Sequence, residues 1–446
     1  MLARLAAMEH KVGTREMPRN FYLKVLLRDR SALIADLLAA AALFSVPWST
    51  SATSVMIVLW LIVLIPTLSS PELYETLLTP AGGLPVALFI LAVLGIFWAD
   101  VDWTTRLHGL RPYYKLLAIP LLLIQFRRSN RGMWVLLSFL ISCIALLVAS
   151  WFLVIFQDQT LWRERQFGVP VRDYIAQSSE FLLCSIALAA VAFNLWRKRR
   201  GMAVLAACLS SLFLANILYT TTGRTALVVL PFLILALAYR QLQWRGIVAA
   251  VFGCAVLGPA IWFTSSNLQN RVYGAFEEVQ EYVRDNRSTN SGLRIEFYVK
   301  SFELISRAPL LGHGTGTISS SFAKLTVGET GATSVPTANP HNQLFAVAIP
   351  LGLVGAGLLL AMWASHLLLF RSADLVDWIG LAVVLQNVIS SMFNSHLMDF
   401  AHGWLYVLGL SVAGGVTLKS SLSSPLSLAG RRYEHARLPQ DTDRHG

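Results

Sequence analysis

The stretch "NPHNQLFAVAIPLGLVGAGLLLAMWASHLLLF", residues 339–370, contains no Asp, Glu, Lys or Arg. Crossing the hydrocarbon core of a bilayer takes roughly 20 helical residues, so the apolar part of this stretch is long enough to span a membrane. Similar apolar runs recur from about residue 31 to residue 418. Lipid cannot satisfy open backbone groups, so bundled helices are expected. The sequence therefore predicts an all-α, polytopic membrane protein.

The composition agrees with this class. Of 446 residues, 55% are hydrophobic and 14% are charged, against roughly 25% charged residues in soluble proteins. The net charge of +11 is spread over short connections between apolar runs, which is typical of topological charge and not of a nucleic-acid surface. The four cysteines lie inside apolar runs without metal-ligand spacing, so we predict that they pack. Membrane lipids are expected partners; nucleic acid is not.

The apolar runs predict about twelve transmembrane helices. Their centres lie near residues 39, 60, 91, 119, 145, 186, 211, 232, 256, 355, 387 and 410. Basic connections orient them with both chain ends in the cytoplasm; "SPELYETLLTPAGG" (70–83), which carries only acids, is the exception. The predicted organisation is a cytoplasmic segment at 1–30, helices one to nine within 31–264, a large noncytoplasmic loop domain at 265–340, helices ten to twelve within 341–418, and a disordered cytoplasmic tail at 419–446.

The predicted loop domain is the longest connection, and long connections usually exist for function. Within it, "LQNRVYGAFEEVQEYV" (268–283) places apolar residues at helical spacing opposite acids, which predicts an amphipathic helix. "LRIEFYVKSFELI" (293–305) predicts a second helix, capped by Asn290 or Ser291. The Gly-, Ser-, Thr- and Pro-rich remainder is typical of irregular structure. Its "LGHGTGT" lacks a full phosphate-binding pattern and favours a close backbone approach.

Two arginines have positions that topology and helix stability do not explain. Arg224, in "TTTGRTAL", lies at a membrane boundary on the predicted noncytoplasmic side, where the positive-inside bias disfavours it. Arg294 opens the second loop helix, where a cation opposes the helix dipole. The structural alternatives are an Arg224 that snorkels to lipid headgroups and an Arg294 paired with Glu296 or Glu277. As a functional pair, two guanidinium groups on one membrane face are suited to clamp a diphosphate.

His341 stands where the quoted stretch turns apolar, between Pro340 and Asn342. An ionisable ring at a membrane boundary is a functional candidate. With a pKa near neutrality, it can take a proton from a hydroxyl nucleophile. The structural alternative is a histidine that only bonds a backbone carbonyl at a helix start. The residues alone leave both interpretations open.

Auxiliary candidates lie on the same predicted side. Asp399 is placed to orient a histidine or an arginine, and His396 precedes it by one helical turn. No His and carboxylate set has convincing zinc spacing, so we predict no metal. Tyr298 follows Arg294 by four residues and shares its side of the helix. The loop "TLWRERQFGVPVRDY" offers further basic residues for acidic groups, with a solvated loop as the alternative. These are Arg163, Arg165 and Arg172.

In this order the motifs resemble the O-antigen ligase family (WaaL type), part of the O-antigen ligase/polymerase group of membrane glycosyltransferases. The resemblance rests on "TTGRTAL", on a large late loop with the arginine-bearing "GLRIEFYVKSFELISRAPLLGHGTG", and on "PHNQLFAVAIPLGL". The last fits a family pattern of His, then Asn, Ser or Gln, then Gly after nine further residues, here His341, Asn342 and Gly352. Similarity at the level of motifs covers mainly residues 220–355.

The resemblance implies an inverting glycosyltransferase of GT-C type that uses no metal or cofactor. It would move a polysaccharide from undecaprenyl diphosphate to a sugar hydroxyl of lipid A-core, in a bacterial inner membrane with the site facing the periplasm. His341 is implied as the general base, and Arg224 and Arg294 as ligands of the donor diphosphate. Cations plus one base suffice, because a diphosphate leaves readily once its developing charge is stabilised.

Three alternatives stay open. An O-antigen polymerase uses the same donor with a second lipid-linked glycan as acceptor. Some polymerases carry an arginine and a glycine separated by ten residues, and the predicted periplasmic loops lack this pair. A protein O-oligosaccharyltransferase of the same group is a further possibility. A transporter of lipid-linked sugars would show two related halves and broken helices near its centre, and the sequence shows no such symmetry.

Overall fold

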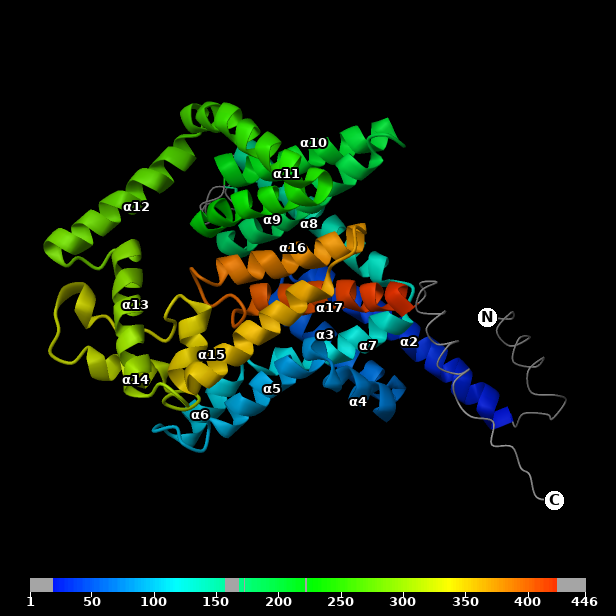
Figure 1. Ribbon diagram of the computed structural model, residues 1–446, viewed down its shortest axis with the longest axis horizontal. Helices are drawn as coiled ribbons and strands as arrows, with labels where there is room; N and C mark the ends of the chain where they lie inside the picture. Colours follow the sequence, from blue (N-terminus) through cyan, green and yellow to red (C-terminus); the bar gives the residue numbers. More distant parts are fainter. Residues whose placement is uncertain (1–18, 157–167, 172, 221–222, 423–446) are drawn as a thin grey trace, which may run out of the picture.

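The computed structural model describes residues 19–156, 168–171, 173–220 and 223–422. Regular elements within these ranges are all helical, and Figure 1 shows a bundle with α12 and α13 at one side. The α-helices are α2 (Arg19–Ser45), α3 (Thr50–Leu64), α4 (Ser70–Leu78), α5 (Pro80–Leu94), α6 (Trp103–Leu110), α7 (Ala118–Arg128), α8 (Gly132–Ile155), α9 (Tyr174–Leu195), α10 (Arg200–Tyr219), α11 (Arg224–Thr264), α12 (Ser266–Asp285), α13 (Asn290–Arg307), α14 (Ile318–Leu325), α15 (Gln343–Leu369), α16 (Leu375–Ser390) and α17 (Phe400–Leu422). The 3-10 helices are η1 (Ile65–Thr67), η2 (Tyr114–Leu117) and η4 (Gly331–Ser334). The predicted terminal segments lie outside the described residues, except where α2 and α17 reach into them.

The helices agree in position with the predicted spans. Each predicted centre lies within an α-helix, and two of them, near residues 232 and 256, share α11. By length and composition, seven helices of the described chain can cross a membrane, or eight if the bent pair α4 and α5 forms one span. The prediction of a polytopic, all-helical membrane protein is confirmed at this level. The number twelve and the GT-C type stay predictions.

α11 consists of two helices joined at a sharp break. Gln243 has a left-handed φ of 53°, and a straight helix of 41 residues would be about 60 Å long. Arg224 begins α11 only six residues after Leu218. Ser265, directly after the end of α11, donates from Oγ to the Leu218 carbonyl at 2.7 Å. Both ends of α11 therefore lie beside the end of α10, and its two halves run in opposite directions.

The acidic connection at 70–83 is helical and not a loop. It forms α4 and the start of α5, which are bent by 87° relative to each other. Its acids face the basic connection at 126–132, where Arg128 Nε donates to Glu72 Oε1 at 3.0 Å. The two connections thus lie on the same side of the bundle, as the predicted topology requires, and the acids neutralise part of the basic charge there.

The core of the bundle surrounds α17, which Figure 1 shows in red and which is the most buried of the candidate spans. It packs against α7, α8 and α16. Cys143 and Cys184 are buried, as predicted for packing residues. Cys208 and Cys254 are exposed on the outside of the bundle. For these two the prediction of packing is wrong, because their helices turn the thiol away from the protein interior.

α15 is interrupted where the glycine-rich loop segment crosses it. Gly352 has a left-handed φ of +66°. Around it, backbone groups bond across to the loop: the His313 N–H donates to the Ile349 carbonyl at 2.9 Å. In the other direction, the Leu353 N–H donates to the Pro309 carbonyl at 2.8 Å. The sequence "LGHGTGT" makes the close backbone approach that its glycines predict, here against a broken helix.

Replacing Gly352 by alanine is expected to cost roughly 1–3 kcal/mol of stability. The new Cβ would lie 2.1 Å from the Leu310 carbonyl oxygen, at a φ that favours glycine. Gly357→Ala in the same helix is the matched control, since no atom lies within 4 Å of a Cβ there. Thermal unfolding in detergent should show a lowered Tm for the first variant alone. Equal Tm values for the two variants would contradict this assignment.

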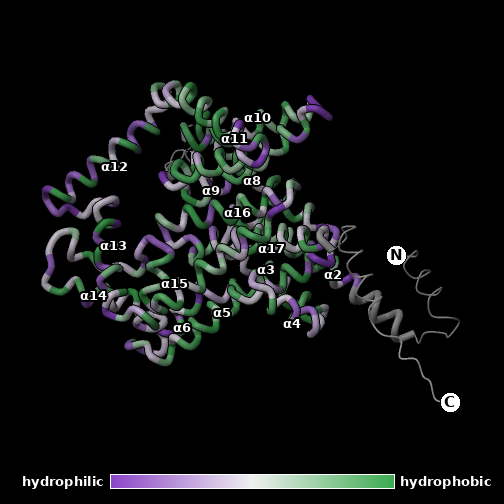
Figure 2. Tube along the Cα trace, viewed as in Figure 1, coloured by the Kyte–Doolittle hydropathy of each residue, from purple (hydrophilic) through white to green (hydrophobic). Residues whose placement is uncertain are grey.

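The two helices predicted in the loop at 265–340 are present as α12 and α13. Figure 2 shows hydrophilic residues gathered along α12, in contrast to the hydrophobic bundle. The cap of α13 is Thr289, whose Oγ1 accepts a backbone N–H at 3.1 Å, and not the predicted Asn290 or Ser291. Asn290 and Ser291 are the first two residues of α13 itself, and the Ser291 hydroxyl donates to Glu278 at 2.6 Å. α14 is an additional helix within the segment predicted as irregular.

Candidate active site

His341 lies in the turn that leads into α15, with a left-handed φ of +54°. This conformation costs a non-glycine residue about 1–3 kcal/mol, and hydrogen bonds at both backbone groups hold it. Its N–H donates to Asn339 Oδ1 at 2.9 Å, and its carbonyl accepts from the Tyr298 hydroxyl at 3.1 Å. Asn342 then caps α15, accepting backbone N–H groups at 2.9 and 3.4 Å. The turn is thus fixed from both sides.

The imidazole ring of His341 packs between α13 and the turn before α17. It stacks on Phe297, with ring centroids 5.9 Å apart and planes 11° apart. Its Nδ1 lies 3.1 Å from Asn394 Oδ1, and the described part of the chain offers no partner to its Nε2. Burial and the nearby charge of Arg294 hold the pKa of His341 below its usual value. A neutral ring with one unengaged nitrogen is suited to accept a proton.

Arg294 lies near the start of α13 and is partly buried. Within the described ranges, neither of the predicted acidic partners pairs with it. Glu296 lies 3.3 Å from the Lys300 ammonium instead, and Glu277 is exposed. The charge of Arg294 is close enough to His341 to lower the pKa of that ring. A guanidinium without a carboxylate partner is therefore available to an anion beside the candidate base.

Arg224, the first residue of α11, is held by Glu278 of α12. Its Nη1 and Nη2 donate to the two carboxylate oxygens at 2.9 and 2.7 Å. Nη1 also donates to Ser291 Oγ at 3.1 Å. A guanidinium carries five N–H donors, so two of them remain for another acceptor. The side chain is fixed to the loop helices and does not snorkel.

Replacing Glu278 by glutamine is expected to loosen α12 from the start of α11. Hydrogen bonds from Arg224 and Ser291 hold the pKa of Glu278 at about 2, below the usual 4.5. The stabilisation is therefore fully present above about pH 4.5 and is lost as the pH falls through the folded-state pKa. The Tm difference from wild type should be constant from about pH 7 to 5 and shrink below.

The control for this variant is Glu277→Gln, because Glu277 is exposed and makes none of these contacts. A Tm difference for Glu278→Gln that persists unchanged at low pH would show that the ion pair is not its source.

Arg224 contacts the start of α13, the helix that carries Arg294. Arg224 bonds Ser291, and Arg294 follows Ser291 by three residues. Residues at this spacing are neighbours on a helix, with Cβ atoms about 5–6 Å apart. Arg271 of α12 joins them: it lies near enough to Arg224 and Glu278 for their charges to interact. Burial and the like charge of Arg224 lower the pKa of Arg271. Arg224 and Arg271 thus lie beside one carboxylate, an excess of one positive charge, and Arg294 is a further cation close to His341.

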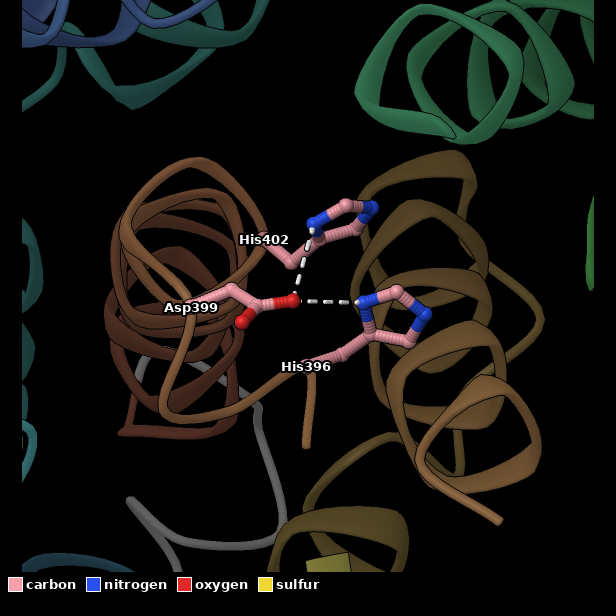
Figure 3. Close-up of side chains that lie close together, drawn as sticks. All are labelled: His396, Asp399 and His402. Carbon is pink, nitrogen blue, oxygen red and sulfur yellow. Dashed lines mark hydrogen bonds and ion pairs between the residues drawn. The ribbon is translucent and has the colours of Figure 1, made fainter. Parts of the chain in front are cut away.

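The turn between α16 and α17 brings His396, Asp399 and His402 together, as Figure 3 shows. Asp399 Oδ2 lies 3.1 Å from His396 Nδ1 and 3.8 Å from His402 Nδ1. The three ligand atoms lie within 4.8 Å of one another, and two imidazoles with a carboxylate are a set that zinc accepts. Sequence spacing did not reveal this set, because the first two residues lie in a turn and not on a helix.

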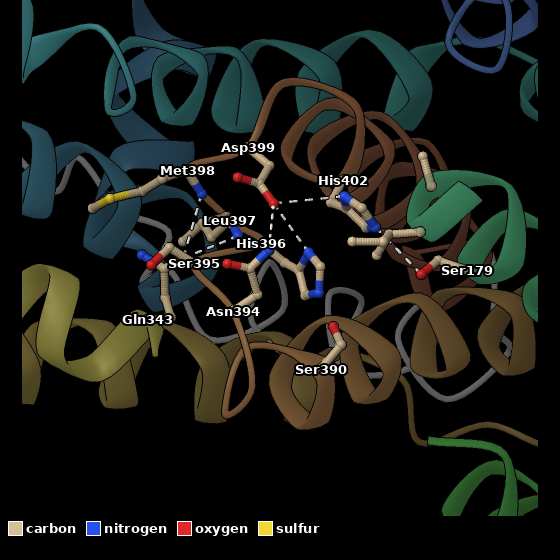
Figure 4. A network of polar contacts seen from close by, with 12 residues as sticks. Ser179, Gln343, Ser390, Asn394, Ser395, His396, Leu397, Met398, Asp399 and His402 are labelled. Carbon is tan, nitrogen blue, oxygen red and sulfur yellow. Dashed lines mark hydrogen bonds and ion pairs between the residues drawn. The ribbon is translucent and has the colours of Figure 1, made fainter. Parts of the chain in front are cut away.

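The carboxylate oxygen of this set is also part of a hydrogen-bond network, which Figure 4 shows from close by. Asp399 Oδ2 accepts from Asn394 Nδ2 at 3.3 Å. The Lys115 ammonium donates to the Asp399 carbonyl at 2.6 Å, and a cation there disfavours a second one. The network ends at Asn394, the partner of His341, and borders a cavity of about 770 Å³ that Asn394, Asp399 and His402 help to line. That no metal binds stays a prediction.

Sequence comparison connects this geometry to a known family. Residues 209–360 match the family model of the O-antigen ligases. We call residues 209–360 the O-antigen ligase segment. It runs from within α10 to beyond the break in α15. It contains Arg224, Arg271, Arg294 and His341, whereas Asn394 lies outside it. The predicted resemblance is confirmed over this segment. A comparison with curated proteins finds no match.

Two of the predicted auxiliary residues hold the O-antigen ligase segment to the turn before α17. The single proton of the Tyr298 hydroxyl is shared by two acceptors, the Met392 carbonyl at 2.6 Å and the His341 carbonyl at 3.1 Å. Asn342 Nδ2 donates to the same Met392 carbonyl at 3.2 Å. Both side chains position the backbone around the candidate base. The predicted loop arginines Arg163, Arg165 and Arg172 lie outside the described residues.

Sequence reasoning missed Arg271 and Asn394. Arg271 precedes Glu278 by seven residues, so both lie on one face of α12. That spacing was readable, but nothing in the sequence shows that Arg224 faces the same side. Asn394 carried no signal of its own, because an amide in a short connection between two apolar helices is ordinary.

Proposed function

We propose that the protein is a glycosyltransferase that ligates O-antigen polysaccharide from undecaprenyl diphosphate onto a sugar hydroxyl of lipid A-core. The observation that carries this proposal is His341 in the O-antigen ligase segment, a ring with a lowered pKa and an unengaged Nε2 beside Arg294. A base next to a cation without a carboxylate partner is the minimum that metal-independent transfer from a diphosphate requires.

The charge around the loop helices suits the donor. A diphosphate esterified at both ends carries one negative charge on each phosphate group. Arg224 and Arg271 beside Glu278 leave one excess positive charge, and Arg294, three residues after the Ser291 that Arg224 contacts, supplies a second. Guanidinium groups bind phosphate oxygens through paired N–H donors. This excess therefore matches the charge of a polyprenyl diphosphate, whose lipid part stays in the bilayer.

In the proposed mechanism, His341 Nε2 takes the proton of the acceptor hydroxyl as its oxygen forms a bond to the anomeric carbon. The bond from that carbon to the diphosphate breaks on the opposite face, which inverts the configuration. The diphosphate leaves with the electron pair, and the arginines stabilise its growing charge. The partly polar cavity beside Asn394 offers space for the acceptor sugar.

The test is reconstitution of the purified protein with a lipid-linked donor and lipid A-core, with metal chelated, and the product resolved on a gel. Transfer onto lipid A-core supports the ligase. Lengthening of the glycan on its lipid carrier would identify a polymerase, transfer onto protein an oligosaccharyltransferase, and movement without a new bond a transporter. Transfer by a variant with His341, Arg224 and Arg294 all replaced by alanine would refute the mechanism.

The polymerase is the second candidate, because the site geometry concerns the donor and the base and leaves the acceptor open. The transporter is less well supported, although the break in α15 at Gly352 supplies one feature expected of it. A transporter has no need of a neutral imidazole beside an arginine that lacks a carboxylate partner.

A further inference from the structure

A histidine acts as a base only through a ring nitrogen that carries no proton, and the group bonded to the other nitrogen decides which one that is. In His341, Nδ1 lies 3.1 Å from the Asn394 side-chain oxygen. The oxygen and nitrogen of an amide look alike in shape, so their assignment must follow from the hydrogen bonds around them. Those bonds fix both amides next to His341.

The first fixed point is the backbone of His341 itself. Its N–H is a donor only, and it points at Asn339 at 2.9 Å, so the Asn339 atom there is Oδ1. The Ser395 hydroxyl donates to the same Oδ1 at 2.7 Å. Asn339 Nδ2 must then point the other way, where it donates to Asn394 Oδ1 at 3.0 Å. The chain of bonds reaches Asn394 with its oxygen facing His341.

The second fixed point is Asp399, on the far side of Asn394. An ionised carboxylate is an acceptor only, so the Asn394 atom 3.3 Å from Asp399 Oδ2 is Nδ2. Burial raises the pKa of Asp399, but its hydrogen bond with His396 and the charges nearby lower it more, so the net shift is downward. The carboxylate is therefore ionised at neutral pH. Both ends give the same orientation of Asn394.

The geometry points to Asn394 as a positioning residue that, held by Asp399, keeps the proton of His341 on Nδ1 and leaves Nε2 as the base. An amide oxygen can only accept, so the nitrogen facing it must be the protonated one. This inference rests on the proposed function in taking His341 as the base. When Nε2 takes the acceptor proton, the Nδ1–H bond to Asn394 stays in place, and the imidazolium later releases the Nε2 proton to water.

An amide partner differs from the carboxylate found next to many catalytic histidines. A carboxylate against the ring would raise the pKa of His341, whereas a neutral oxygen does so less. The charged and titratable groups that face this ring are Arg294 from α13, and Asp399 and His396 from the turn before α17. Asn394 stands between the ring and Asp399, so the carboxylate fixes the amide without pairing directly with His341.

The test uses nitrogen NMR of the full-length protein labelled at its nine histidines, with the His341 signals assigned by their loss in His341→Gln. Wild type should show Nδ1 protonated and Nε2 unprotonated. In Asn394→Ala the second tautomer should appear. In Asp399→Asn, which leaves every direct contact of His341 intact, Asn339 still holds the Asn394 oxygen, so a smaller share of the second tautomer should appear. The control is Asn194→Ala. Asn194 is exposed near the C-terminal end of α9, and its replacement should leave the His341 signals unchanged.

Activity gives an independent readout of the same change. Asn394→Ala should lower kcat about 10- to 100-fold, the range seen when a partner that orients a metal-bound histidine is removed, with KM little changed. Because the hydrogen bond that His341 Nδ1–H donates to Asn394 supports the charged ring, its loss should move the acid limb of the pH profile to lower pH. A purely structural role would lower the Tm without moving that limb.

The outcomes separate this inference from the proposed function. A wild-type His341 with its proton on Nε2, or an unchanged tautomer and kcat in Asn394→Ala, would overturn the inference even if His341→Gln is inactive. An active His341→Gln would overturn the role of His341 as the base, while the tautomer measured by NMR would still test the hydrogen-bond chain.

Discussion

His341→Gln is expected to reduce transfer to lipid A-core by about 10²- to 10⁴-fold, the usual contribution of a positioned general base. Glutamine is polar and of similar length, but it cannot take a proton from the acceptor hydroxyl. The initial rate of transfer in proteoliposomes measures the effect. His108→Gln in α6 is the matched control, since His108 is exposed. Loss of activity in both variants would point to a general effect of replacing histidine.

The pH profile of the wild-type enzyme checks the same role. Burial and Arg294 hold the pKa of His341 below its usual value of 6.5. A base works in its neutral form, so the rate should be flat at neutral pH and fall only as the pH drops below 6.5. Arg294→Ala removes one cause of the lowered pKa of His341, so the fall in rate on the acid side of the profile should move to higher pH. An acid-side fall in rate that begins above pH 6.5 in the wild type would contradict the assignment of His341 as the base.

Arg294→Ala is expected to lower kcat/KM about 10²- to 10³-fold, as removal of one preorganised donor to a developing anion does. Arg294 has no carboxylate partner within the described ranges, so its loss should barely affect the fold. Arg224 is a less clean test because its replacement also breaks the contact with Glu278. Arg294→Lys should recover only part of the activity, since an ammonium keeps the charge but not the planar fork.

Arg307→Ala on the same helix is the control for this prediction, because Arg307 pairs with Glu303 and is exposed. Inorganic diphosphate should also inhibit the wild type more strongly than the Arg294→Ala variant. Equal activity of the Arg294 and Arg307 variants would remove Arg294 from the site and leave the donor charge to Arg224 and Arg271.

Local pattern predicted the helices well, because burial in lipid and helical spacing both act over a few neighbouring residues. α12 and α13 follow from apolar residues that recur at helical spacing between polar breaks. At 70–83 the sequence predicted only an acidic connection, and the chain forms α4 there, against the basic connection. An ion pair with that distant segment holds the short helix in place.

The candidate site was predicted in its residue types and not in its contacts. His341, Arg224 and Arg294 stand out because each conflicts with a local rule of topology or helix stability. Glu278 is one of the acids on the polar face of the predicted amphipathic helix, and nothing in that pattern shows that it holds Arg224. The reason is that solvation of a side chain depends on what packs across from it, which the pattern along one helix does not contain.

By itself, the sequence determined that this protein is a bundle of membrane helices, that a long loop carries two amphipathic helices, and that a histidine lies just before α15 within the O-antigen ligase segment. Only the tertiary structure decided that Arg224 forms an ion pair with a carboxylate while Arg294 does not, and which ring nitrogen of His341 has no hydrogen-bond partner among the described residues. Those outcomes depend on contacts between residues far apart in the sequence. Arg224 and Glu278 are separated by 54 positions, and His341 and Asn394 by 53. A charge or a proton is placed by the groups that surround it in space, and the packing of the helices alone brings those groups together.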